Sequence, residues 1–349
     1  MSYTNGLDKP SDYFNTKLYT GNGSTGHAIT GVGFQPDLIW IKRRNSSSNH
    51  ILTDAVRGNT KWLESNGNNA EQTGSDRITS FNSDGFSLGS NANVNANTGT
   101  FASWNWKAGT SFTNDASATG IGNIDSTGSV NTDAGFSVIS YTGDANADNT
   151  VAHGLGSVPK MIILKNRSIS SNWMVYHAST GAQAPLFLNL GNAAGSGDPD
   201  RFKVVPTSSV FTPGTAQEGN GSGNSIIAYC FSEKKAFSKF GSYTGNGSTN
   251  GSYIHLGFSP AFVMVKRTDS TANWQILDNK RNTYNPWNTA LFPDTTDPDT
   301  TDYSTDHLSN GFKLRVTTTS RNGSGASYIY MAFAENPFVT STGVPATAR

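Results

Sequence analysis

One pattern occurs three times in the 349-residue chain, as GVGFQPDLIWIK (residues 31–42), GLGSVPKMIILK (residues 154–165) and LGFSPAFVMVK (residues 256–266). Each copy begins with a glycine-containing turn that ends in a proline, and a lysine stands six residues after that proline. The four residues before each lysine, LIWI, MIIL and FVMV, are apolar at consecutive positions instead of alternating. We therefore expect a central β-strand that is covered on both faces.

The repeat extends to both sides of this pattern. Tyr-Thr-Gly begins at Tyr19, Tyr141 and Tyr243, which lie 17 or 18 residues before the prolines. Eight residues after each lysine, His50, Trp173 or Trp274 opens a second apolar run. These spacings predict repeated units at 12–110, 133–235 and 236–338, with an N-terminal arm at 1–11, a Gly/Ser/Asn/Thr-rich linker at 111–132 and a C-terminal tail at 339–349.

The units are expected to be all-β. Their apolar segments are four to eight residues long, rich in Ile, Val and aromatic residues, and bounded by Gly, Pro, Asn and Ser. Amphipathic helical periodicity is scarce. A unit of about 100 residues with several such strands has the size of a β-sandwich, so we predict three sandwiches, either in series or closely packed.

The composition excludes several classes of protein. Ser, Thr and Asn contribute 117 residues, and 25 basic residues balance 25 acidic ones. A neutral chain lacks the basic surface that nucleic-acid binding needs. No apolar run approaches the ~18 residues of a membrane span, so membrane insertion is not expected. Cys230 is the single cysteine and lies in a strand segment, where we predict a buried small residue instead of a reactive thiol. We expect no cofactor.

A repeated set of charged residues is one candidate ligand site. Lysine is followed by aspartate after twelve residues and by arginine three residues later, and the second copy has His177 and Thr180 at these last two positions. The set could bind an anionic sugar or a carboxylate, or it could form ion pairs that hold a strand and its turn. Its members are Lys42, Asp54 and Arg57 in the first copy and Lys266, Asp278 and Arg281 in the third.

Tryptophans and clustered aspartates provide two more candidates. Trp62 and Trp287 lie in variable loops and are predicted to be exposed contacts for a glycan, whereas the other five tryptophans lie in repeated strand segments. The stretch PDTTDPDTTD places four carboxylates close together, which suggests a calcium site or solvated turn residues. These carboxylates belong to Asp294, Asp297, Asp299 and Asp302.

The string GNGSTG at residues 21–26 matches a dinucleotide-binding pattern, but HAITGVGFQP follows it instead of a helix. A hairpin turn is the preferred interpretation. No serine-hydrolase, zinc-protease or kinase motif occurs, so we do not expect an enzyme.

Several strings together resemble a family of virion structural proteins of marine tailed phages, described as tail-fibre-like or minor structural proteins. They are YTGNGS, GVGFQPDLIWIKRR, VAHGLGSVPKMIILKNRS, NWMVYHAS, IIAYCFSEKKAFSKFGSYTGNGS, SNGFKLR and YIYMAFAENPF. The resemblance covers almost the whole chain. It implies concanavalin-like or jelly-roll β-sandwiches and offers no catalytic residues.

This resemblance, together with the neutral loop-rich composition, predicts a protein assembled in the host cytoplasm and exposed on the extracellular particle. We expect it to belong to the tail or tail fibre, to form a homo-oligomer, and to contact other virion proteins and host envelope glycans. A decoration protein of the capsid or tail without a receptor role is the first alternative. A glycan-processing enzyme is the second.

Overall fold

The structure is a computed structural model that describes residues 6–345. It is all-β, with 41% of residues in strands and 4% in helices, which confirms the predicted class and the predicted scarcity of helix. Within residues 6–345 the helical segments are single turns, namely η1 (Pro10–Asp12), α1 (Ala92–Asn95), α2 (Ala116–Thr119) and α3 (Gln217–Asn220). None of the helices in this range is long and apolar enough to cross a membrane.

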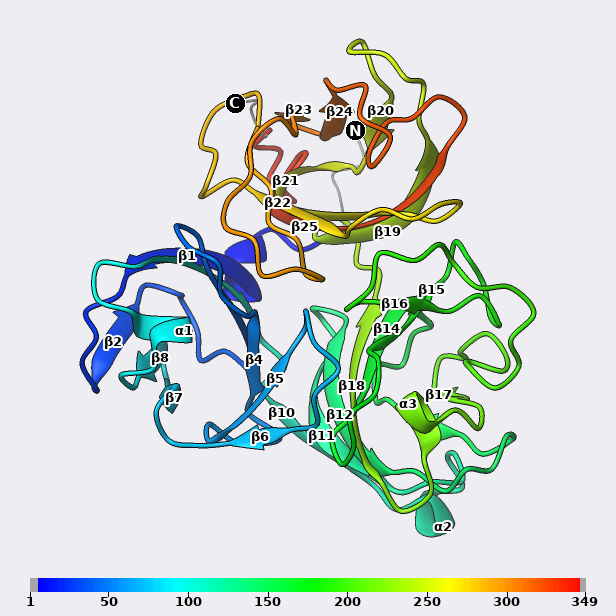
Figure 1. The fold of residues 1–349 in the computed structure, drawn as a ribbon. Helices are drawn as coiled ribbons and strands as arrows, with labels where there is room; N and C mark the ends of the chain where they lie inside the picture. The colour runs from blue at the N-terminus through cyan, green and yellow to red at the C-terminus, as the bar shows by residue number, and fades with distance from the viewer. Residues whose placement is uncertain (1–5, 346–349) are drawn as a thin grey trace.

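The strands fall into three groups, which we call the first (residues 14–106), second (110–232) and third (238–337) units (Figure 1). The strands of the first unit are β1 (Phe14–Thr20), β2 (His27–Thr30), β3 (Leu38–Arg43), β4 (Ile51–Asp54), β5 (Lys61–Glu64), β6 (Gln72–Thr73), β7 (Ile78–Asn82), β8 (Gly85–Leu88) and β9 (Thr100–Trp106). The strands of the second unit are β10 (Thr110–Asn114), β11 (Ser126–Asn131), β12 (Phe136–Thr142), β13 (Val151–Ala152), β14 (Pro159–Asn166), β15 (Met174–His177), β16 (Leu186–Phe187), β17 (Val210–Phe211) and β18 (Ser225–Ser232). The strands of the third unit are β19 (Ser238–Thr244), β20 (Tyr253–His255), β21 (Phe258–Arg267), β22 (Gln275–Asp278), β23 (Thr305–Leu308), β24 (Gly311–Leu314) and β25 (Ser327–Pro337).

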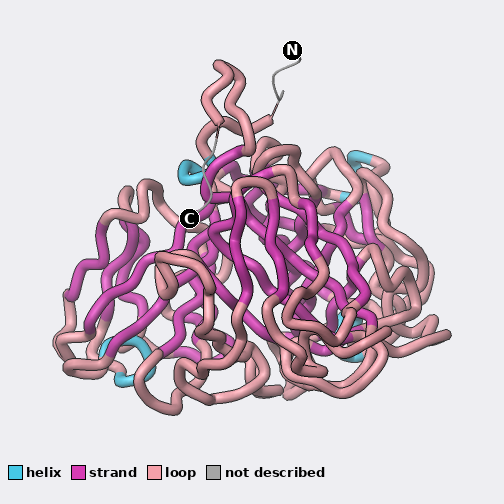
Figure 2. Tube along the Cα trace, turned by 90° about the horizontal axis from the view of Figure 1, so that it is seen from above, coloured by secondary structure: helices cyan, strands magenta, loops and turns pink. Residues whose placement is uncertain are grey.

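Each unit pairs a large antiparallel sheet with a small one. The large sheets have the orders β1-β9-β3-β4-β5-β6, β10-β11-β12-β18-β14-β15-β16 and β19-β25-β21-β22, and the small sheets are β2-β8-β7, β13-β17 and β20-β24-β23. The large sheets share one four-strand arrangement, β1-β9-β3-β4, β12-β18-β14-β15 and β19-β25-β21-β22. Strands form the middle of the body and loops lie at its periphery (Figure 2).

The strand that carries the repeated apolar run is buried on both faces, as predicted. In β3, Leu38 and Trp40 point into a central cluster, whereas Ile39 and Ile41 point into the cluster beneath the small sheet. The same alternation occurs at 161–164 in β14 and at 262–265 in β21. Consecutive side chains of a strand point to opposite faces, so a sheet packed on both sides requires an uninterrupted apolar run.

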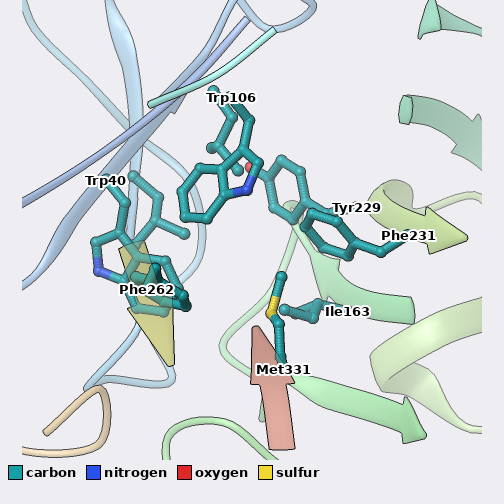
Figure 3. Close-up of a pocket in the computed structure, with 9 residues that line it drawn as sticks. Trp40, Trp106, Ile163, Tyr229, Phe231, Phe262 and Met331 are labelled. Carbon is teal, nitrogen blue, oxygen red and sulfur yellow. The ribbon is translucent and has the colours of Figure 1, made fainter. Parts of the chain in front are cut away.

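The central cluster joins the three units into one closely packed body. Phe14 lies 5.6 Å from Phe262 and 5.0 Å from Phe333 between ring centroids, and Trp106 lies 6.3 Å from Phe231. Side chains from all three units converge in this cluster (Figure 3), among them Trp106 of the first unit, Phe231 of the second and Phe262 of the third. The void among them is about 10 Å³ and entirely apolar in its lining. A space of this size barely accommodates one water molecule, so we assign it to packing and not to ligand binding.

The predicted linker at 111–132 is wrong. This stretch contains most of β10 and all of β11, which pair with each other over five residues and extend the large sheet of the second unit beyond β12. Ser129 also donates from its Oγ to Asp37 of the first unit at 2.9 Å. The polar sequence is compatible with strands because an edge hairpin is held by backbone hydrogen bonds and needs little apolar burial.

The segment GNGSTG at 21–26 is not a hairpin turn. It connects β1 of the large sheet to β2 of the small sheet, and β1 and β2 pair with β9 and β8 instead of with each other. A strand follows the glycines where dinucleotide binding would need a helix.

The repeated tyrosine fixes this connection in each unit. The hydroxyl groups of Tyr19 and Tyr243 donate to backbone carbonyls at 2.8 Å, and Tyr141 makes the equivalent bond. The residue after each acceptor is a buried asparagine whose side chain binds the backbone of the same turn. These asparagines are Asn95, Asn220 and Asn322. The sequence analysis did not single out these asparagines. Each of them nevertheless stands six residues before the second residue of the last strand of its unit.

Candidate functional site

Each of the three units contacts the other two, and one buried lysine lies at each of the three interfaces. Each lysine closes the repeated apolar strand and donates through Nζ to a backbone carbonyl of the neighbouring unit. The bonds run from Lys42 to Thr296 at 3.0 Å, from Lys165 to Asn68 at 3.2 Å and from Lys266 to Gly191 at 3.0 Å. Burial lowers the pKa of each lysine to about 8. The prediction that Lys42 and Lys266 contact a surface ligand is therefore wrong, because both side chains bind the protein itself.

The interface between the first and second units is closed by an ionic network. Arg57 Nε donates to Asp54 at 2.5 Å and Arg57 Nη1 to Glu71 at 3.2 Å. Arg167 of the second unit binds Glu71 through Nε at 2.8 Å and Nη2 at 3.0 Å, and the Tyr229 hydroxyl donates to Asp54 at 2.7 Å. Burial opposes ionisation, but the hydrogen bonds from Arg167 and the charge of Arg57 hold the pKa of Glu71 below its usual value.

The interface between the third and first units has the same construction. Arg281 Nε donates to Asp278 at 2.6 Å and Arg281 Nη1 to Asp299 at 3.0 Å. Arg44 of the first unit binds Asp299 at 2.8 Å, and Trp104 Nε1 donates to Asp278 at 3.1 Å. Asp54, Arg57, Asp278 and Arg281 therefore form buried ion pairs, which was the alternative to ligand binding.

The interface between the second and third units keeps the backbone contact and the buried lysine but lacks the ionic network. Ala194 N donates to Thr268 O at 2.9 Å, just as Glu71 N donates to Arg167 O at 2.9 Å and Asp299 N to Arg44 O at 2.8 Å. Thr180 stands where the other units have Arg57 and Arg281. His177 replaces the aspartate and lies against the carbonyl of Tyr330, with Nε2 at 3.2 Å from it. Ala194 thus stands where the other interfaces have an acid, and Thr180 and Thr268 stand where they have arginines.

An open groove of about 620 Å³ lies at this third interface. Thr180, Ala194 and Thr268, which replace the two arginines and the acid, all line it, and so do other hydroxyl side chains and two tyrosines. We call it the interface groove, and its lining residues include Thr180, Ala194, Ser242, Tyr243, Thr268, Asp269, Ser327 and Tyr328. Sequence reasoning did not find it, although the exchange of arginine for Thr180 in the second copy was a visible signal.

The two tryptophans predicted as exposed contacts are buried. Trp62 is 5% exposed and Trp287 is 0% exposed. The guanidinium of Arg77 lies 3.6 Å from the ring centroid of Trp62 and covers it. Trp287 packs with Leu277, Ala290 and Phe292 in a cluster of its own. The loop assignment was wrong for Trp62, which lies in strand β5, and Trp287 is buried although it lies outside the named strands.

Three of the four aspartates proposed as calcium ligands bind protein groups through their carboxylates. Asp294 accepts from the backbone of Trp274 at 3.1 Å, and burial raises its pKa to about 7. Asp297 accepts from Thr295 Oγ1 at 2.9 Å, and Asp299 serves the ionic network. Asp302 adopts a left-handed backbone conformation with φ of 75°. Among residues 6–345, no group of three or more His, Cys, Asp or Glu side chains is arranged to hold a metal ion.

Cys230 is fully buried in β18, as predicted, and burial raises the pKa of its thiol.

Residues 9–337 match the family described as a domain of unknown function, DUF7483. The chain belongs to this family. The match spans all three units, so the family is defined by the whole closed body and not by one unit. Comparisons with curated proteins and with solved structures find no match to the chain.

Proposed function

We propose that the chain is a structural protein of a phage virion, exposed on the particle surface in the tail or tail fibre, and that it contacts glycans of the host envelope. The observation that carries this proposal is the interface groove, which is open at one of three otherwise equivalent interfaces. Its volume of about 620 Å³ falls within the range of roughly 300–1,000 Å³ typical of small-molecule sites. The resemblance to virion structural proteins supplies the setting.

The proposal includes the origin of the body as three tandem copies of one concanavalin-like or jelly-roll sandwich at 12–110, 133–235 and 236–338. Support comes from the shared four-strand order of the large sheets and from the equivalent lysines at the interfaces. We further propose that the chain forms a homo-oligomer bound to other virion proteins.

Particles lacking the protein test the receptor role. We expect them to assemble normally but to adsorb poorly to host cells, and purified protein should compete with intact particles for the cells. Imaging of labelled protein on the particle should locate it at the tail. Normal adsorption of particles that lack the protein would contradict the proposal.

A decoration protein without a receptor role is the second candidate. The shared central cluster and the two ionic interfaces favour it, since they make a rigid body suited to reinforcing a particle. This candidate predicts that particles without the protein are fragile to heat or osmotic shock and adsorb at the normal rate.

A further inference from the structure

The interface groove differs from the other two interfaces in its side chains, whereas the backbone hydrogen bond between the units is the same at all three. At the other two interfaces, Glu71 and Asp299 each bind an arginine of the adjoining unit and fill the equivalent space. At the groove, Ala194 and Thr268 hold the same backbone bond, but neither side chain reaches across. The groove therefore results from the side chains at three positions, Thr180, Ala194 and Thr268, and not from loose packing between the second and third units.

The lining has the chemistry of a site for hydroxylated, uncharged ligands. Seven of its residues carry aliphatic hydroxyl groups, which both donate and accept hydrogen bonds. These are Ser179, Thr180, Ser196, Ser242, Thr244, Thr268 and Ser327.

The charge in the groove is a single carboxylate. Asp269 is the one charged residue that lines it, and Arg267 donates to Asp269 at 2.7 Å and lowers its pKa, so that it stays ionised. An ionised carboxylate accepts hydrogen bonds through both oxygens and suits a pair of adjacent sugar hydroxyls. Arg267 offsets the charge of this carboxylate, and none of the lining residues is a cation that would attract a carboxylated or phosphorylated ligand.

Tyr243 adds an aromatic side chain to the wall of the groove, and the fully buried Tyr328 packs behind it. Their rings stack with centroids 4.9 Å apart, and both hydroxyl groups already donate to backbone carbonyls, at 2.8 Å to Arg321 and at 2.6 Å to Thr319. The half-buried ring of Tyr243 can therefore contribute apolar surface, as the C–H face of a pyranose requires, while the surrounding hydroxyl groups serve its polar edge.

We propose that the interface groove binds a neutral saccharide. This inference rests on the proposed glycan-binding function and deepens it by naming the site and the ligand class. It replaces the anionic sugar considered from the sequence, because the basic residues then proposed as ligands are enclosed in the ionic interfaces.

The test restores the missing ionic pair. The double variant Ala194→Glu with Thr268→Arg reproduces the Glu71–Arg167 contact and should fill the groove. A control, Ser208→Glu with Ser222→Arg, adds the same charges at exposed positions that do not line the groove. All proteins are first screened on an array of neutral hexose oligosaccharides and of sialylated and uronic-acid oligosaccharides, and the best binder is then titrated by calorimetry.

We expect wild type and the control to bind neutral oligosaccharides with equal affinity. The filled-groove variant should lose binding by more than 100-fold while keeping its melting temperature. Asp269→Asn should weaken binding by about tenfold, the usual scale of one charge-assisted hydrogen bond.

Other outcomes would contradict different parts of the proposal. Equal binding by the filled-groove variant would remove the groove as the site and leave the glycan function standing. Binding of acidic oligosaccharides alone would overturn the ligand class. Absence of any glycan binding by wild type would overturn both this inference and the proposed receptor role.

Discussion

Glu71 is the residue on which the first ionic interface depends, since its carboxylate binds both Arg57 and Arg167. We predict that Glu71→Ala lowers the free energy of unfolding by about 3 kcal/mol, because it leaves the largely buried Arg167 without its acidic partner and removes one of the two acidic partners of Arg57. Urea denaturation measures the change. Asp148→Ala is the matched control, since Asp148 is 80% exposed in its pair with Lys203 and its loss should cost less than about 1 kcal/mol. Equal effects of the two substitutions would contradict the buried network.

His177 should make stability sensitive to acid. Burial lowers its pKa to about 4, below the value of about 6.5 in an unfolded chain. Between these values the unfolded state binds more protons, so the stability that His177 contributes is present above pH 6.5 and is lost as the pH falls towards 4.

We predict that wild type loses about 2 kcal/mol more than His177→Gln between pH 7 and pH 5, measured by urea denaturation at both values. Asp294, whose raised pKa acts in the opposite direction, is present in both proteins and cancels in the comparison. Parallel losses in the two proteins would show that His177 is protonated in the folded state.

At the residue scale, spacing predicted which residues act together but not what they face. The regular distances from lysine to aspartate to arginine are real, and these side chains do share interfaces. Glu71 lies 14 residues after its partner Arg57, and Arg167, which binds Glu71, belongs to another unit, so the repeated spacing does not report either residue. For the same reason Trp62 appeared exposed, since Arg77 covers it across a fold that the sequence does not display.

At the element scale, β3 is the clearest test of burial on both faces. We predict that Ile41→Asp unfolds the protein, because Ile41 is 0% exposed and an unpaired carboxylate would enter the cluster beneath the small sheet. Thr30→Asp, at an exposed position of β2, should change the free energy of unfolding by no more than about 0.5 kcal/mol. Circular dichroism and thermal melting distinguish the outcomes, and a folded Ile41→Asp protein would refute the packing of this strand.

Strand prediction succeeded where burial imposes a composition and failed where it does not. Both faces of β3, β14 and β21 meet apolar clusters, so their sequences are continuous apolar runs. The hairpin β10–β11 lies at a sheet edge, where Ser, Thr and Gly suffice. Its pairing depends on backbone groups that every residue carries, and a polar stretch with that composition is equally typical of a linker.

At the scale of the whole molecule, one central cluster serves all three units. We predict a single cooperative thermal transition, with equal calorimetric and van't Hoff enthalpies, because melting one unit would expose the central faces of the other two. Differential scanning calorimetry provides both quantities. Separate transitions for the units would contradict the shared cluster.

The two ionic interfaces also limit how many ligands one chain can hold. A body with three equivalent interfaces would offer three grooves, but Asp299 and Glu71 close two of them. If the proposed saccharide binding holds, each chain would be monovalent, and avidity for a cell surface would come from the number of chains that an assembly displays. The strength of attachment would rise steeply with copy number, while a single detached protein would dissociate readily.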